Sequence, residues 1–487
     1  MNLKTLSVAL LLASGSGFAA NEILSNAADR QSLAVAIYND GLALIRESRQ
    51  LNLAEGENQI ALRDVSGMIM SETVSLKAGD ADVQLLEQNF DYDLLSEASL
   101  LDKYVGKEVK VISRRANGEE SSEKATLLAY NDGSIVLQYA DRIETGLAEN
   151  ARLAFAELPV NLRDRPTLNL RLQSATAGEQ KVDVAYLSTG LRWQADYVAN
   201  LSADEKTLDL AGWVTLNNQS GTRYENAQLQ LIAGDVNRAP PEVLRRAYAA
   251  EAMMMAATPA AAQMSEEALF EYHLYTLNRP TTIQNNQSKQ VALLSGNQIP
   301  VRKEYRLQGS DYWYYRAVEN AELGEERKVA VYVEFDNKEE AQLGLPLPKG
   351  VVRVYKSDSQ DRALFIGEDR IAHTAKNETV RLKLGDAFDV KGVWKHLSTE
   401  PVSSAQLVGK LLGGKGKAYD IKVSISLSNA KEEAVSVKIV EPIPGFWEMQ
   451  SESHPHQKVG ANLAQWNVPV PAEGKAELNY TVRVRFD

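Results

Sequence analysis

Apolar and polar residues alternate with a period of two along most of this chain, and that pattern restricts it to β-sheet architectures. Residues 32–53, SLAVAIYNDGLALIRESRQLNL, contain two such runs around Asn39-Asp40-Gly41. Successive side chains of a strand point to opposite faces, so each run buries one face. Asp-Gly suits a tight hairpin because its central positions need positive φ. The letters YNDG recur at 130–133 between two further alternating runs. We therefore expect a mainly β protein.

Cysteine is absent from all 487 residues, so neither disulfides nor thiolate chemistry are available to this chain. The length suits about three domains, and domains of this size bury adequate cores without cross-links. The formal net charge of −12 argues against nucleic acid as a partner, because phosphate contacts need clustered Lys and Arg.

The first twenty residues, MNLKTLSVALLLASGSGFAA, have the parts of a secretory signal peptide. Lys4 precedes an apolar run at 6–13, and Gly17-Phe18-Ala19 fits the small-x-small cleavage rule. No later stretch reaches the roughly 18 apolar residues of a membrane helix. We expect cleavage after Ala19 or Ala20, no integral membrane segment after cleavage, and a periplasmic location, with secretion as the alternative.

The rhythm of strands and turns divides the chain into a β leader, a small barrel and immunoglobulin-like sandwich units. A single short helix is expected just before the barrel strands, where Ser96 can cap its start and Gly106 its end. The expected boundaries are 1–20 for the signal peptide, 30–99 for the N-terminal β domain, 100–158 for an SH3- or Sm-like small β-barrel, 166–400 for a β-sandwich region and 415–487 for a C-terminal immunoglobulin-like β-sandwich.

Three segments share one arrangement: an alternating strand that ends in asparagine, a polar turn and a returning strand. The asparagines are Asn217, Asn337 and Asn429. One stretch departs from this β pattern, because residues 239–268 are rich in Ala and Met. Pro240 and Pro241 can open a helix there, so we expect a helical excursion from the sandwich.

Several long motifs resemble the domain-of-unknown-function 4139 family, whose relatives are also labelled mucoidy-inhibitor-like. They include YLSTGLRWQADYVANL at 186–201, PLPKGVVRVYKSD at 346–358, FIGEDRIAHT at 365–374 and LKLGDAFDVKG at 382–392. The resemblance is to the bacterial periplasmic branch and covers about residues 166–487. It implies an exported, largely β protein of the cell envelope with no established activity, and it supplies no catalytic residues.

The segment SESHPHQK, residues 451–458, is a candidate metal site. Pro455 favours an extended backbone for His454, and residues two apart on a strand share a face. His454 and His456 are therefore candidate ligands, with Glu452 as the third that such a site needs. The alternative is a polar hairpin whose side chains bond to the turn.

Two further clusters are candidate contacts for a ligand or partner. Glu368, Asp369 and His373 combine carboxylates with an imidazole, which suits acid–base work if they share a cleft; a surface ion-pair hairpin is the alternative.

The segment SDYWYYRAV places aromatic side chains on both faces of one extended stretch. Tyr312, Trp313 and Tyr314 are candidates for stacking on sugar rings, with a role in the sandwich core as the alternative.

These features favour an exported binding or scaffolding protein of the cell envelope that lacks enzymatic activity, and we expect no cofactor. An envelope protein or glycan is the expected partner. One alternative is a metal-dependent or acid–base hydrolase acting on an envelope polymer. Another is a secreted surface adhesin.

Overall fold

The computed structural model describes residues 22–78, 83–115, 117–131, 133–159, 162–234, 236–237, 264–310, 314, 324–360, 362–402 and 417–486. The chain is mainly β, as its alternation predicts. It divides into a first unit, within residues 1–193, 216–232 and 279–289, and a second unit, within residues 194–215, 233–278 and 290–487. No helix among the described residues is long and apolar enough to span a bilayer.

Apart from the small sheet described below, the first unit contains two sheets, and the predicted hairpin at 39–41 joins two neighbouring strands of the second. One sheet has the order β1 (Ile23–Ser25), β4 (Gly56–Arg63), β12 (Thr167–Ser174), β6 (Val83–Asp91). The other places side by side β16 (Tyr224–Ala233), β2 (Arg30–Tyr38), β3 (Ala43–Leu53), β13 (Gly178–Ser188) and β5 (Ser75–Ala78), with β19 (Thr281–Ile283) beside β16. Gly41 takes φ +73° in the turn between β2 and β3, the positive φ for which a hairpin selects glycine.

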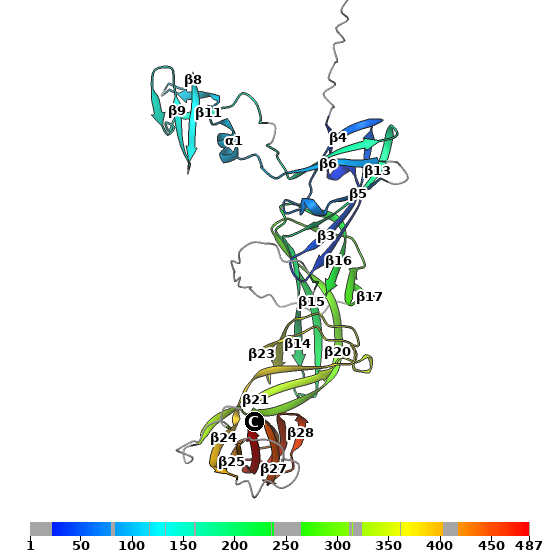
Figure 1. Cartoon of the computed structure of the whole chain (residues 1–487), viewed down its shortest axis with the longest axis vertical. Helices are drawn as coiled ribbons and strands as arrows, with labels where there is room; N and C mark the ends of the chain where they lie inside the picture. The colour runs from blue at the N-terminus through cyan, green and yellow to red at the C-terminus, as the bar shows by residue number, and fades with distance from the viewer. Residues whose placement is uncertain are drawn as a thin grey trace, which may run out of the picture. The chain divides into compact units, whose positions relative to one another are not determined.

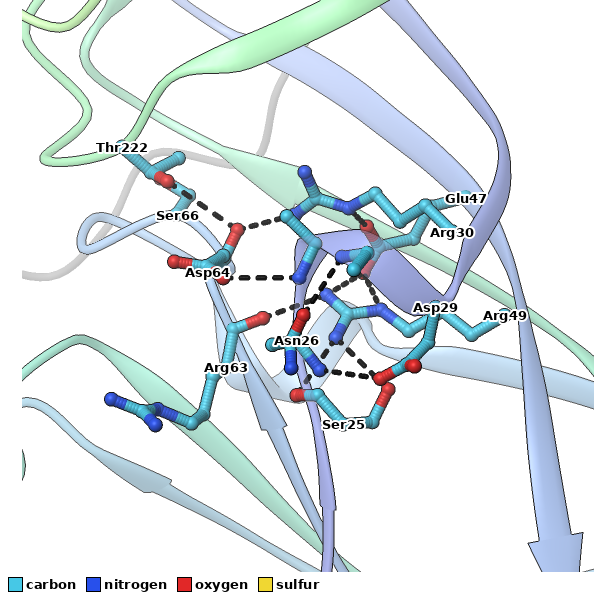
Figure 2. A network of polar contacts seen from close by, with 12 residues as sticks. Ser25, Asn26, Asp29, Arg30, Glu47, Arg49, Arg63, Asp64, Ser66 and Thr222 are labelled. Carbon is cyan, nitrogen blue, oxygen red and sulfur yellow. Dashed lines mark hydrogen bonds and ion pairs between the residues drawn. The ribbon is translucent and has the colours of Figure 1, made fainter.

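A buried ion network ties the first strand into this unit (Figure 2). The Arg49 guanidinium has no exposed surface, and it donates to the carbonyl oxygens of Ser25 and Arg63 at 3.2 and 2.8 Å. The Glu47 carboxylate is shared between Arg49, at 2.9 Å, and Arg30, at 2.5 Å. These charges are paired and hydrogen-bonded, which is the condition for burying them.

A small α/β region of the first unit begins with the predicted helix, α1 (Glu97–Tyr104), whose first turn is capped by the Ser96 hydroxyl. Its sheet has the order β10 (Ile143–Thr145), β9 (Ser134–Gln138), β8 (Glu120–Asn131), β7 (Glu108–Arg114), β11 (Ala151–Ala154) (Figure 1). Short strands follow the helix, as predicted, but the predicted barrel is wrong because the sheet is open, with β10 and β11 at opposite edges. All three residues of β10 are exposed, so this strand has no buried face that would favour closure.

The second unit is built on one long sheet path. Its order is β23 (Ala363–Ile371), β22 (Gly350–Ser357), β14 (Leu191–Leu201), β15 (Thr207–Asn218), β20 (Gln287–Gln308), β21 (Glu325–Asp336), β24 (Thr379–Pro401), β25 (Lys417–Asn429), β30 (Lys475–Phe486), β27 (Phe446–Glu452). A branch from β20 leads through β26 (Val435–Pro442) and β29 (Leu463–Val470) to β28 (Gln457–Gly460).

The C-terminal strands form a sandwich, as the alternating pattern predicts (Figure 1). One layer contains β24, β25, β30 and β27, and the other contains β26, β29 and β28. Ile425 and Leu478 of the first layer share a core with Ile439 and Trp466 of the second. Each of these side chains is at most 1% exposed. This region therefore folds because inward positions of both layers are apolar.

Asn429, at the end of β25, is buried and fully hydrogen-bonded. Its Nδ2 donates to the carbonyl oxygens of Glu433 and Pro471 at 2.8 and 2.9 Å. Its Oδ1 accepts from the Lys431 amide at 3.0 Å. One side chain thus holds the turn after its own strand and a segment distant in the sequence.

The same arrangement recurs at the two other strand ends. Asn337 donates to Leu345 and Ala375 carbonyls, at 2.8 and 3.0 Å. In the first unit the buried residue is Asn218, not the predicted Asn217, which is half-buried on the other face of the strand. What recurs in the three segments is therefore a buried asparagine at the end of a strand: Asn218, Asn337 and Asn429.

Two other predictions fall mostly beyond what the structure describes. The signal peptide at 1–20 lies outside the described residues. So does most of the predicted helical excursion at 239–268, of which only 264–268 is described. That short part is not helical, because it belongs to the strand β17 (Met264–Leu269), which pairs with β18 (Tyr272–Leu277).

Candidate functional site

A groove of about 210 Å³ opens in the second unit where β21, β23 and β24 approach one another. Its floor is apolar and its rim carries both signs of charge. The lining side chains are those of Leu201, Glu205, Lys303, Val331, Val333, Ile366, Leu384 and Asp386. They include no histidine, serine or threonine, so the groove's lining offers no imidazole and no serine or threonine hydroxyl.

Glycine shapes this groove. Gly367 of β23 has φ +152°, and a Cβ there would lie under 3.0 Å from the Leu384 carbonyl oxygen of β24. Only glycine permits that close approach in this conformation. Beside it, the Asp369 carboxylate accepts from the Lys383 amide at 2.7 Å. Two of the motifs that carry the family resemblance, FIGED and KLGDA, therefore meet at the groove.

An apolar strip runs along the adjoining edge strand. Leu364, Phe365 and Ile366 are consecutive residues of β23 with exposed fractions of 54, 52 and 36%. Within the described residues β23 is the terminal strand of its sheet and pairs only with β22. Exposed apolar residues on an edge strand are unusual, because such edges recruit other strands. We call these three residues the β23 strip.

Phe388 is displayed by a distortion of β24. Asp386 lies opposite Ala330 and Lys391 lies opposite Lys328, so residues 387–390 of β24 oppose a single residue of β21. This bulge leaves the Phe388 ring 90% exposed. Bulges commonly re-aim a side chain next to functional sites, and Asp386, two residues earlier, lines the groove.

The charged rim is held by ion pairs. Glu205 contacts the ammonium groups of Lys303 and Lys356 at 2.6 and 2.5 Å. Partial burial alone would raise the pKa of Glu205, but the hydrogen bonds from both lysines outweigh it and lower that pKa. Glu205 is therefore ionised at neutral pH and fixes two lysines at the rim.

The predicted acid–base residues do not meet in a common centre. Glu368 pairs with Arg353 at 3.3 Å, whereas Asp369 bonds to the backbone of β24. His373 Nδ1 accepts from the Lys349 amide at 3.2 Å. Each of these three side chains bonds to a different partner, so their role here is to hold together the strands around the groove.

Of the three candidate metal ligands, the structure brings two together. Glu452 contacts His456 Nδ1 at 2.9 Å and accepts from the Trp466 indole at 2.9 Å. His454 instead bonds to the Ser453 hydroxyl at 3.0 Å. Among the described residues no group of three or more His, Cys, Asp or Glu side chains is arranged to hold a metal ion.

Glu452 is a charged acceptor in this pair. Burial alone would raise the pKa of Glu452, but hydrogen bonds from Trp466 and His456 outweigh it and lower that pKa.

Tyr312 and Trp313 lie outside the described residues, whereas Tyr314 is 4% exposed in the C-terminal core. Its hydroxyl is 2.7 Å from that of Tyr480 and 3.4 Å from the Glu441 carboxylate. Arg327 lies 3.6 Å from Glu441. Tyr314 is therefore a core residue of the sandwich, which was the alternative to stacking on a sugar ring.

Burial raises the pKa of Glu441 to about 7, and Arg327 opposes that rise. The sequence reasoning missed this buried cluster. The sequence contains a signal for it. Glu441 follows the buried, inward-facing positions of β26 that begin at Val435, and Arg327 precedes the inward-facing Val329 on β21. A charge in an inward position of an alternating strand marks such a cluster.

The fold and these surfaces define a multi-sheet β protein with an open groove and, among the described residues, no assembled metal centre. The chain belongs to the family described as Domain of unknown function (DUF4139), whose sequence model matches residues 182–487. No curated protein matches the chain.

The two groove glycines provide a matched test of the close approach. Gly385 has the same φ of +152° as Gly367, but open space around its Cβ position. Gly385→Ala should lower the free energy of unfolding by about 1 kcal/mol through backbone strain alone. Gly367→Ala should lower it by about 3 kcal/mol, because β23 must also move away from β24. Urea unfolding measures both, and equal effects would contradict the close approach.

Proposed function

We propose that this protein is exported to the periplasm, where it binds an extended segment of a partner polypeptide at the β23 strip and its groove. The observation that carries the proposal is three consecutive exposed apolar residues, Leu364–Ile366, on a terminal strand. A partner strand added at such an edge gains main-chain hydrogen bonds, and the neighbouring pocket selects its side chains.

The groove and Phe388 supply the selectivity. Ile366 belongs both to the strip and to the groove wall, so an added segment can place one apolar side chain in the groove. Phe388, whose ring is 90% exposed, offers the large aromatic contact that typically dominates the energy of an interface. The favoured occupant is therefore an extended segment with apolar residues at alternate positions.

A binding role accords better with the described side chains than hydrolysis does. The groups predicted for acid–base work, Glu368, Asp369 and His373, each bond to a separate partner. General acid–base catalysis needs such groups within reach of one substrate.

The location is tested by cell fractionation. We expect the mature chain in the periplasmic fraction, with an N-terminus at residue 20 or 21 when that fraction is sequenced. Recovery in the cytoplasm with residues 1–20 still attached would overturn the proposal of export. Recovery in the culture medium would favour the adhesin alternative.

The binding surface is tested with two phenylalanine variants. Phe388→Ser should leave folding unchanged and weaken partner capture about tenfold or more, because a fully exposed ring contributes to binding but not to the core. Phe270→Ser is the matched control, since Phe270 is 88% exposed on the turn between β17 and β18. Equal capture by the two variants would contradict a role for this surface.

A further inference from the structure

A second surface, in the first unit, carries the features of a ligand site. A hollow of about 540 Å³ lies on the sheet face formed by β16, β2, β3, β13 and β5. This volume is within the range of small-molecule sites. Its lining includes no aromatic residue, so stacking is not its means of recognition.

The register explains why the sheet is hollow there. One row across the five strands reads Gln228, Ala34, Arg46, Ala185, Ser75. The adjacent row reads Ser32, Ser48, Asp183, Lys77. Small side chains therefore form the floor, while long polar side chains stand around it. Three hydroxyl groups and an amide line the hollow, as a ligand rich in hydroxyls requires.

Two cations at the hollow lack a carboxylate partner. Arg46 donates to the Gln230 amide oxygen at 2.8 Å, and neither Arg46 nor Lys77 forms an ion pair with any carboxylate that the structure describes. The Asp183 carboxylate, which stands opposite Lys77 in the strand register, accepts from the Ser48 hydroxyl and lies 3.9 Å from Lys181. The other acidic residue of the lining, Glu47, is paired with Arg30 and Arg49. The side chains that face the hollow thus leave positive charge available in a chain whose formal net charge is −12.

From this geometry we infer that the hollow binds an acidic saccharide chain. The Cα atoms of Arg46 and Lys77 are separated by two strand spacings and two residues, about 12 Å, so two anionic groups repeated along one ligand can reach both cations. The Ser48 and Ser75 hydroxyls lie within this span, and Ser32 and Gln228 lie beyond Arg46. These groups match the hydroxyls of sugar rings. This site is independent of the β23 strip and goes beyond the proposed function.

The test uses calorimetric titration of the full mature chain with a hexamer of galacturonic acid. We expect saturable binding that weakens as salt is added. The methyl ester of the same hexamer should bind about tenfold more weakly or worse, because its carboxylates are neutral. No binding of the hexamer, or equal binding of the ester, would overturn the inference.

Three variants and one competitor locate the site. The double variant Arg46→Gln, Lys77→Gln should weaken hexamer binding about tenfold or more. Ala185→Leu should weaken it similarly by filling the floor without changing charge. Lys110→Gln, an exposed lysine of β7 without an ion pair among described residues, is the control and should bind as the wild type does. Unchanged binding by both hollow variants would place the saccharide elsewhere and overturn the assignment.

Inorganic phosphate separates a saccharide from a simple anion. At matched charge concentration it should compete weakly, because it engages one cation and none of the intervening hydroxyls. Full displacement of the hexamer by phosphate at that concentration would show recognition of the anion alone and would overturn the assignment to a saccharide.

Discussion

Replacing Asn429 with alanine is expected to lower the free energy of unfolding of the C-terminal sandwich by about 3 kcal/mol. The residue is 3% exposed, and the substitution removes all three hydrogen bonds of its amide. Each lost bond costs about 1 kcal/mol, and more where the abandoned partner stays buried. The substitution also removes the side chain that joins the turn after β25 to the segment at Pro471.

Hydrogen exchange read by mass spectrometry measures this effect in the intact chain, because it reports the stability of the β25–β30 region separately. Asn467→Ala is the control, since Asn467 is exposed on β29 of the same sandwich and should change stability by less than about 0.5 kcal/mol. Similar losses from both substitutions would refute a special role for the buried asparagine.

The second large effect concerns pH and Glu441. Burial raises the pKa of Glu441 to about 7 in the folded protein, from an ordinary 4.5. Between these values the folded state binds more protons than the unfolded state. The free energy of unfolding therefore falls as pH rises from 4.5 to 7, and this group alone accounts for about 3 kcal/mol of that fall.

Glu441→Gln should abolish this contribution, because the amide is close in shape and carries no charge at any pH. The measurement is urea unfolding at several pH values from 4.5 to 8, compared between variant and wild type. Glu477→Gln, on the exposed face of β30, should follow the wild-type curve. If the free energy of unfolding of Glu441→Gln depended on pH as the wild type's does, Glu441 could not be the buried carboxyl that is protonated in the folded state below pH 7.

Much of the fold could be predicted because period-two alternation fixes which side chains enter a core. The strands that build the C-terminal sandwich, and the hairpin at Asp40-Gly41, follow directly from that local pattern. The open sheet at 108–154 could not be predicted, because closure depends on whether two distant edge strands meet. The buried asparagine was misplaced by one residue at Asn218, since a slip of one position exchanges the faces of a strand.

The candidate site was less accessible to sequence reasoning. Histidines and carboxylates draw attention as chemical groups, yet Glu368 and His373 bond to separate partners, Arg353 and the Lys349 amide, that no local pattern predicts. The groove depends instead on Gly367 approaching β24, and the exposure of Phe388 depends on a bulge. Neither a close approach nor a bulge leaves a periodic signal, although both lie within the residues that the family model matches.

The most direct test of the proposed binding surface is photo-crosslinking in living cells that express the protein, with benzoylphenylalanine placed at Phe365, at Phe388 or at Phe270. If a partner strand binds there, the first two positions yield adducts with the same polypeptide partner and position 270 yields none. Absence of adducts at 365 and 388, or the same adducts at 270, would contradict a binding surface on the β23 strip.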